Sequence, residues 1–347
     1  MDACLLDEWG GQLAPTTVPA PEPEPHEVCV DVRACGVTRT IENAIQGGLA
    51  DDAALTPRIP GHEFAGVVAA VGDAVDEFAP GDRVLSYFYL TCGSCDFCRR
   101  GQPNRCSNFG GWYGVHCDGA YAEQAVIPAT NLLPLPDGAS FAAGAIATDG
   151  LATPLHICRR AEITDTDTVL VIGAAGRIGI HLVQLAARRG ARVLAADVDD
   201  SRLEEIDSVT QQAVTPIDFR GDPGQLADRL RAATPNSEGP SVVVDTVGDV
   251  ETLRQTWKAM AMGGRLVTLT THHDRSFAPP LKDFVVGEKS LLGTRYATKD
   301  EVVRAARLLA DGRITPIVSE RVGLSEVPAV HERIRNGTSH GMVVLEP

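Results

Sequence analysis

Four cysteines lie within a stretch of fifteen residues and have the spacing C-x2-C-x2-C-x7-C. Four thiolates suit tetrahedral Zn²⁺, and a zinc ion with four protein ligands leaves no open position for a substrate. The same residues could form two disulfides or a redox switch, although an intracellular chain keeps its thiols reduced. The C-x-x-C-x-x-C opening could also suggest an iron–sulfur cluster, yet the fourth spacing differs from the common ferredoxin pattern. We therefore predict a structural zinc site with the ligands Cys92, Cys95, Cys98 and Cys106.

A glycine-rich loop at residues 173–179 has the pattern G-x-x-G-x-x-G between a predicted strand and a predicted helix. Glycines at such a point let the backbone turn tightly and approach a pyrophosphate at the helix N-terminus. Asp197 ends the next predicted strand, where a carboxylate accepts hydrogen bonds from the adenosine ribose. Because that carboxylate repels a 2′-phosphate, the loop favours NAD(H) over NADP(H), although Arg202 could soften the preference. The alternative is a structural turn with Asp197 as a surface acid. The predicted cofactor-binding residues here are Gly173, Gly176, Arg177, Ile178, Gly179, Asp197 and Arg202.

The elements that must position these motifs are of two kinds. Up to about residue 150 the chain has short β-rich runs, such as 28–32, 66–71 and 83–87, bounded by Gly, Pro or Asp. From about residue 151 apolar strands, beginning with 168–172 and 192–196, alternate with amphipathic helices. This alternation predicts an α/β fold with a parallel, doubly wound sheet that follows a β-rich domain.

Together with the sequence Gly61-His62-Glu63, the cysteine lobe and the glycine loop resemble the zinc-containing medium-chain alcohol dehydrogenases. The resemblance covers essentially the whole chain. It implies a GroES-like, β-rich catalytic domain that is interrupted by a Rossmann domain, and an assembly into a homodimer or homotetramer. The implied boundaries are 1–150 for the catalytic domain, with the lobe at about 91–107, then 151–293 for the Rossmann domain and 294–347 for a return to the catalytic domain.

The resemblance also implies a catalytic zinc, which family members hold with a Cys, the His of Gly-His-Glu, and a Cys or Asp just before the Rossmann domain. Such a zinc polarises the substrate oxygen and permits hydride transfer to nicotinamide. His62 and Glu63 match the family motif, and Asp149 lies where some members use Asp as the third ligand.

The first ligand of this catalytic zinc departs from the family pattern. Thr38 stands where the family carries the zinc-bound cysteine, and a neutral hydroxyl is a far poorer ligand than a thiolate. Cys35, Glu63 or water could complete the coordination shell. Alternatively, Cys35 packs as a small apolar residue.

The two residues after Thr38 fit the family better. Arg39 occupies a position where the family often carries Arg or His against the cofactor pyrophosphate, and the resemblance implies a charge-assisted contact there. Thr40 matches the catalytic hydroxyl that relays the substrate proton towards solvent. The histidine that usually continues this relay falls near Asn43, which cannot titrate.

Three functions remain open at this point. In the first, an NAD(H)-dependent alcohol dehydrogenase or ketone reductase uses a zinc held by His62, Asp149 and one of Cys35, Glu63 or water. In the second, a zinc-independent reductase of the enone, quinone or acryloyl-CoA type keeps only the structural zinc, as Thr38 and the Gly-Ala-Ala-Gly start of the loop favour. In the third, the chain is a cofactor-binding structural protein without activity.

No motif identifies the substrate. Phe88, Trp112 and Tyr113 either line its pocket or pack the cysteine lobe.

The composition narrows the choice of partners. A net charge of −15 argues against nucleic acid and anionic membranes, since phosphate contacts need clustered Lys and Arg. No stretch has the roughly 20 apolar residues that a membrane span needs, and no signal peptide is recognised, so we expect a cytoplasmic protein. Its expected partner is a small alcohol, ketone or enone. The scarcity of lysine fits either a high-salt habitat or a GC-rich genome.

Overall fold

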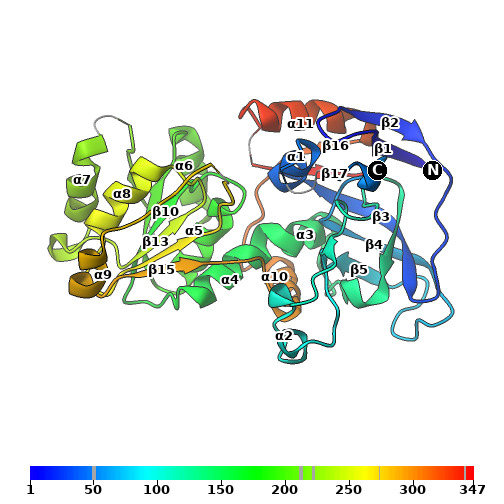
Figure 1. The fold of residues 1–347 in the computed structure, drawn as a ribbon, viewed down its shortest axis with the longest axis horizontal. Coiled ribbons are helices and arrows are strands. Elements are labelled where there is room, and N and C mark those ends of the chain that lie inside the picture. The colour runs from blue at the N-terminus through cyan, green and yellow to red at the C-terminus, as the bar shows by residue number, and fades with distance from the viewer. Residues whose placement is uncertain (49–51, 211–213, 221–222, 273, 340) are drawn as a thin grey trace. The chain divides into compact units, whose positions relative to one another are not determined.

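The computed structural model describes residues 1–48, 52–210, 214–220, 223–272, 274–339 and 341–347. The chain forms two compact units, shown in Figure 1: unit 1 comprises Met1–Ala152 and Ala297–Pro347, and unit 2 comprises Thr153–Tyr296. Unit 1 therefore receives both ends of the chain. None of the helices in the described residues is long and apolar enough to cross a membrane.

Unit 1 is built on a seven-stranded sheet with the order β16-β17-β3-β4-β5-β9, in which β8 also pairs with β3. The long strand β3 is its centre, because it pairs antiparallel with β4, β8 and β17. Strands β1 and β2 form a separate hairpin, and β6 and β7 form another small pair. The strands are β1 (Asp2–Leu6), β2 (Leu13–Thr17), β3 (Glu27–Val37), β4 (Phe64–Val71), β5 (Arg83–Ser86), β6 (Tyr89–Leu90), β7 (Gly111–Trp112), β8 (Gln124–Pro128), β9 (Leu132–Pro134), β16 (Val318–Val322) and β17 (Met342–Leu345).

Short helices cover this sheet and carry some of the candidate site residues, such as Arg39 and Thr40. The helices of unit 1 are α1 (Arg39–Ile45), α2 (Asp96–Arg99), α3 (Phe141–Ile146), α10 (Lys299–Ala310) and α11 (Val327–Arg335). Helix α10 begins with a capping box, in which the side chains of Thr298 and Glu301 each accept a backbone N–H. Helix α3 continues into a π-helical turn, Ala147–Leu151, and then into α4 (Ala152–Arg160), so the helix is locally widened at Asp149.

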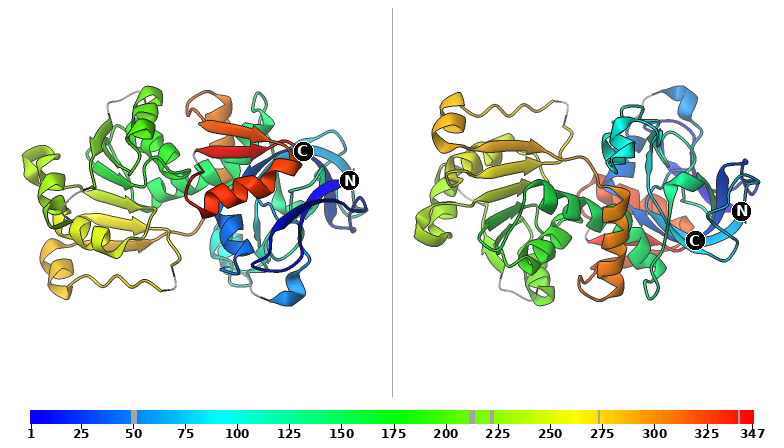
Figure 2. Two further views of the ribbon diagram at one scale, coloured as in Figure 1. Left: turned by 90° about the horizontal axis from the view of Figure 1, so that it is seen from above. Right: turned by 90° about the horizontal axis from the view of Figure 1, so that it is seen from below.

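Unit 2 contains a six-stranded sheet with the order β12-β11-β10-β13-β14-β15, and every pair in it is parallel. This is the strand order of a Rossmann domain, as predicted. Its core packs around apolar side chains such as Leu170, Val243 and Trp257. The elements are β10 (Thr168–Ile172), α5 (Gly179–Arg188), β11 (Arg192–Ala196), α6 (Asp200–Val209), β12 (Val214–Ile217), α7 (Leu226–Ala232), β13 (Val242–Asp245), α8 (Val250–Ala259), β14 (Arg265–Thr268), α9 (Leu281–Gly287) and β15 (Ser290–Gly293). Helices lie on both faces of the sheet, as the two views in Figure 2 show.

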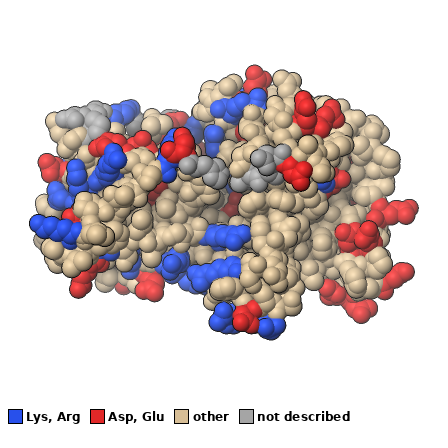
Figure 3. Space-filling model, in the orientation of Figure 1, with Lys and Arg blue, Asp and Glu red and all other residues tan. Residues whose placement is uncertain are grey.

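The charge of the protein is visible on its surface. Acidic side chains gather over the end of unit 1 at the right of Figure 3. This distribution agrees with the net charge of −15.

Candidate active site

The cysteine lobe of unit 1 brings all four predicted thiols together. The Sγ atoms of Cys92, Cys95, Cys98 and Cys106 lie within 4.8 Å of one another. Cys106 Sγ lies 3.5 Å from Cys92 Sγ and 3.9 Å from Cys95 Sγ. The edge of a zinc–tetrathiolate tetrahedron with bonds of 2.3 Å is about 3.8 Å. The four residues therefore fit a structural zinc, and these sulfur–sulfur separations are too long for disulfide bonds.

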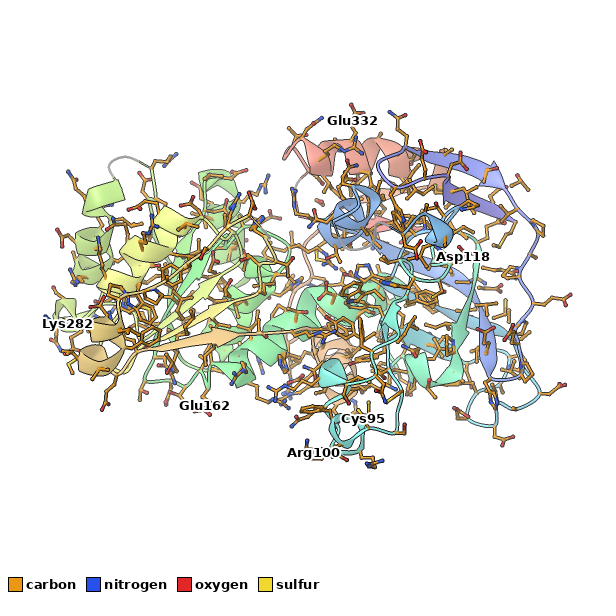
Figure 4. All side chains as sticks on the ribbon, viewed as in Figure 1. Cys95, Arg100, Asp118, Glu162, Lys282 and Glu332 are labelled. Carbon is orange, nitrogen blue, oxygen red and sulfur yellow. The ribbon has the colours of Figure 1, made fainter. Side chains whose placement is uncertain are left out.

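Backbone groups of the lobe prepare two of these thiols, Cys92 and Cys95, to bind a cation. Helix α2 starts directly after Cys95, and Figure 4 shows this residue with Arg100 in the lobe. Hydrogen bonds from the backbone of Cys98 and from Ser107 lower the pKa of the Cys95 thiol to about 5. Hydrogen bonds from the backbone of Ser94 and Cys95 lower the pKa of the Cys92 thiol to about 7. Both thiols therefore ionise more readily than an ordinary cysteine, and the thiolate is the form that binds zinc.

A second possible metal site in unit 1 consists of His62, Glu63 and Asp149, whose ligand atoms lie within 4.8 Å of one another. All three residues are buried, and His62 Nε2 is 3.2 Å from Glu63 Oε1. The carboxylates of Glu63 and Asp149, whose oxygen atoms lie within 4.8 Å of each other, repel each other when both are charged. A cation or a proton must therefore neutralise part of their charge. One imidazole and two carboxylates are suitable ligands for a divalent metal ion.

Local geometry explains how neighbouring residues His62 and Glu63 reach this site. Gly61 has a φ of +105°, and a β-carbon at this position would lie 2.5 Å from Cδ1 of Tyr121. Only glycine is accommodated here, and the chain turns directly before His62. On β3, Gly36 lies opposite Glu63 and donates its N–H to the Glu63 carbonyl at 2.7 Å. A β-carbon at Gly36 would lie 2.6 Å from Glu63 Oε2, so the absent side chain leaves room for the carboxylate.

Cys35 does not belong to this group of ligands. Gly36 faces the Glu63 carboxylate, and because successive residues of a strand point to opposite faces, Cys35 points away from it. Its thiol is fully buried, and its Sγ lies 3.8 Å from the Gly36 carbonyl oxygen. The expectation that Cys35 completes a metal shell is thus not supported by the geometry, and its position fits a packed small residue.

Thr38, at the usual position of the zinc cysteine, caps helix α1. Its hydroxyl oxygen accepts the Ile41 N–H at 3.2 Å. Arg39 and Thr40 form the first turn of α1, where Thr40 is partly exposed. The guanidinium of Arg39 donates to the Ile334 carbonyl of α11 at 2.8 Å.

The glycine loop of unit 2 connects β10 to α5 and has the compact form that a pyrophosphate needs. A β-carbon at Gly179 would lie 2.1 Å from the Gly173 carbonyl oxygen, so helix and loop pack too closely for a side chain. Arg177 lies in the loop, and Ile178 is the N-cap of α5. Asp197 follows β11, and its Oδ2 accepts the Ala175 N–H at 2.8 Å. The acid thus fixes the loop to the end of the neighbouring strand.

Both units resemble known domains. Residues 24–137 match the family model "Alcohol dehydrogenase GroES-like domain", and residues 178–311 match "Zinc-binding dehydrogenase". An acryloyl-coenzyme A reductase of Metallosphaera sedula is 30% identical over 83% of either chain. The chain belongs to the zinc-containing medium-chain dehydrogenase/reductase family.

Other members of this family cover the chain completely. An NAD-dependent alcohol dehydrogenase of Saccharolobus solfataricus is 28% identical over all of both chains. The structure of a cobalt- and zinc-bound thermostable alcohol dehydrogenase from Pyrobaculum aerophilum has a TM-score of 0.88 and 27% identity over 100% of this chain and 99% of that one. The protein is therefore an alcohol dehydrogenase-like oxidoreductase, and we do not retain the non-enzymatic alternative.

Polar residues at the ends of β13 and β14 of this dehydrogenase/reductase were not predicted from the sequence. Buried Asp245 accepts hydrogen bonds from the backbone of Val247 and Gly248 and from the Thr268 hydroxyl. Arg275, from the segment after β14, donates to the Gly248 carbonyl. These contacts shape the carboxyl edge of the sheet, where Rossmann domains bind their ligands. The signal was an acid at the end of an apolar run, the same signal that identified Asp197.

The aromatic candidates fall into two groups. The Phe88 ring lies against the His62 imidazole, with ring centroids 4.3 Å apart. Trp112 packs with Phe109 and His116 beside the lobe, and buried Tyr113 packs against Phe64. Of the three predicted aromatic residues, Phe88 has a contact with the His62 ring.

Proposed function

We propose that this protein is an NAD(H)-dependent alcohol dehydrogenase or ketone reductase with a divalent metal, preferably zinc, held by His62, Glu63 and Asp149. The observation that carries the proposal is the buried clustering of these three ligand groups. When bound, the metal would act as a Lewis acid on the substrate oxygen. The same residues without a cation would leave two carboxylates in mutual repulsion.

The other residues have complementary roles in this proposal. Phe88 gives the site an apolar wall beside His62, which limits the access of water. Thr40 would transfer the substrate hydroxyl proton, and Arg39 would contact the pyrophosphate, both by resemblance to the family.

We further propose that the cofactor is NAD(H). The Asp197 carboxylate stands at the end of β11, where it would repel a 2′-phosphate. Arg202 is already paired, because its Nε lies 2.7 Å from Asp199 Oδ2, so it is less able to attract that phosphate. The charge next to the predicted ribose site is therefore negative.

The deciding experiment combines metal analysis with a substrate screen. The dialysed protein should contain about two zinc equivalents per chain, and Asp149→Ala should contain about one. Alcohols, ketones and enones are screened with NAD(H) and NADP(H) in parallel, at low and high salt. Ketone or alcohol turnover that is lost in Asp149→Ala would support the proposal; one zinc equivalent in the native protein would contradict it.

The second candidate is a metal-independent reductase of a polarised C=C bond. Two observations favour it: Thr38 caps α1 and provides no thiolate, and an acryloyl-coenzyme A reductase is among the relatives. In that case only the lobe would hold zinc. Enone or acryloyl-thioester reduction that is unaffected by Asp149→Ala would establish this function instead.

We also propose that the protein forms a homodimer or homotetramer through the edge of the unit 2 sheet. Strand β15 is an edge strand, and edge strands expose unpaired backbone groups. Helix α9, which precedes it, exposes large apolar side chains: Leu281, Val285 and Val286 are 82%, 78% and 63% exposed. A second copy related by two-fold symmetry would cover both. Light scattering should show a dimer or tetramer that Val285→Glu dissociates, whereas a monomeric native protein would refute the assembly.

A further inference from the structure

A buried, hydrogen-bonded chain of polar side chains in unit 1 starts next to Gly61, directly before His62. These side chains have no role in the proposed chemistry. The hydrogen-bonded chain contains Tyr121, His331 of α11 and Glu42 of α1, all of which are buried. The Tyr121 hydroxyl is 3.1 Å from His331 Nε2, and His331 Nδ1 is 3.0 Å from Glu42 Oε2. Arg335 closes the chain, since its Nε donates to Glu42 Oε1 at 2.7 Å, and its side chain is 41% exposed.

The hydrogen bonds of this chain converge on the Glu42 carboxylate. Burial raises the pKa of Tyr121, so its hydroxyl keeps its proton, and this proton is available for His331 Nε2. His331 then carries its proton on Nδ1 and donates it to Glu42. Burial lowers the pKa of His331, which favours this neutral tautomer. Burial alone would raise the pKa of Glu42, but hydrogen bonds from His331 and Arg335 outweigh it and lower this pKa, so the carboxylate is charged.

The chain meets the candidate site at two points. Tyr121 packs its ring against Gly61, directly before His62, and its backbone N–H donates to the Pro60 carbonyl at 2.9 Å. Through His331, the Tyr121 hydroxyl is linked to Glu42, which lies on α1 two positions after Thr40. One hydrogen-bonded chain thus connects the two segments that supply the proposed catalytic groups Thr40 and His62.

We propose that Tyr121, His331 and Glu42 are positioning residues, which fix the start of α1 relative to the Gly61-His62-Glu63 turn. This inference rests on the proposed function, because it assigns Thr40 and His62 to one active site. Helices α1 and α11 pack against each other, as the left view of Figure 2 shows, so the C-terminal segment supports α1. The return of the chain to unit 1 therefore contributes to the geometry of the active site as well as to the fold.

The test compares Tyr121→Phe with Tyr113→Phe. Both tyrosines are fully buried in unit 1, and each hydroxyl makes a hydrogen bond to this unit, from Tyr113 to the Val126 carbonyl at 3.0 Å. Both variants should therefore lose about 2 °C of Tm. Only Tyr121→Phe should lower kcat, by about tenfold, with an unchanged Kd for NADH. Equal kcat losses in the two variants, or none in either, would overturn the proposal.

A second readout does not depend on turnover. Hydrogen exchange followed by mass spectrometry should show faster exchange of residues 38–45 in Tyr121→Phe, and native exchange of the same residues in Tyr113→Phe. If the native protein oxidises no alcohol and reduces no ketone, the proposed function fails, while this measurement still tests the positioning. Should Tyr121→Phe not fold, Glu42→Gln, which keeps the side-chain shape and removes the charge, should give the same local increase. Unchanged exchange at 38–45 in the folded variants refutes the inference.

Discussion

The space next to Glu63 allows a quantitative test of the proposed metal site. In Gly36→Ala, the new methyl group would lie 2.6 Å from Glu63 Oε2 and 3.3 Å from Glu63 Cβ. An ordinary contact needs about 3.4 Å, so the carboxylate must move by about 0.8 Å. Glu63 is fully buried and its Oε1 lies 3.2 Å from His62 Nε2, so this movement also disturbs the imidazole.

Two opposing effects set the size of the stability loss. Forcing a methyl group into a packed interior costs about 1–3 kcal/mol. Replacing glycine by alanine in an extended strand restricts the unfolded chain and returns about 0.4–1 kcal/mol. We expect a net loss of about 1–2 kcal/mol in the free energy of unfolding. Displacement of a ligand should weaken binding of the second metal equivalent by about 10–100-fold, comparable with the loss of a supporting contact.

Chemical denaturation and metal competition would measure these two effects, with Gly323→Ala as a control. Gly323 has a φ of −86°, and a β-carbon there would lie 3.8 Å from the nearest atom, Glu326 Oε2. This variant should change the free energy of unfolding by less than about 0.5 kcal/mol. Native stability and metal affinity in Gly36→Ala would show that Glu63 does not fill the space over Gly36 and would refute the reasoning.

Three further outcomes follow from the site and its surroundings. Asp149→Asn, which keeps the volume of the side chain, should release the second metal equivalent and leave the lobe zinc in place, as measured by elemental analysis after dialysis. Asp197→Asn should reduce the preference for NADH over NADPH by at least about tenfold in kcat/KM; an unchanged preference would show that the acid does not face the 2′ position. The pKa of His331 is lowered in the folded state, so stability should fall as the pH drops below its unfolded pKa of about 6.5, by up to about 1.4 kcal/mol per pH unit. Chemical denaturation at several pH values should show that this slope is reduced in His331→Gln.

The local signals predicted the elements well because they depend on neighbouring residues. The strands 168–172 and 192–196 coincide with β10 and β11, since apolar runs between turns bury both faces of a parallel sheet. The cysteine spacing identified the lobe for the same reason, because its ligands lie close in sequence. By contrast, β3 runs from Glu27 to Val37, well beyond the predicted 28–32, because pairing with β4 and β17 continues past Asp31.

Contacts between distant residues could not be read from spacing. Nothing in the sequence places His331 next to Glu42, 289 positions away, or Tyr121 over Gly61. The role of Cys35 also depended on strand alternation within β3, and its exclusion needed the pairing of Gly36 with Glu63. The residue types were sufficient to suggest candidate ligands. Which candidates lie close together depends on the face of β3 to which each side chain points.

Thr38→Cys would test why the site lacks a thiolate. Position 38 lies two residues after Gly36 in extended backbone, with φ −133° and ψ 152°, so its side chain leaves the chain on the same side as the space that holds Glu63. The substitution removes the hydroxyl that caps α1, which should cost about 1 kcal/mol of stability. It also offers a thiolate, a softer and stronger zinc ligand than a carboxylate, so zinc affinity at this site should rise by at least about tenfold.

Cobalt bound at the second site, with the lobe zinc retained, provides the spectroscopic readout for Thr38→Cys. We expect a thiolate-to-cobalt absorption band in Thr38→Cys that the native protein lacks at this site. Cys35→Ala should leave the native spectrum unchanged, since that thiol faces the other side of β3. A thiolate band in the native protein that disappears in Cys35→Ala would reverse the assignment, because Cys35 would then reach the metal and the alternation argument would be wrong. If the native protein shows no such band, the Thr38 hydroxyl serves only to cap α1, and the metal ion must be bound by the His62 imidazole and the carboxylates of Glu63 and Asp149.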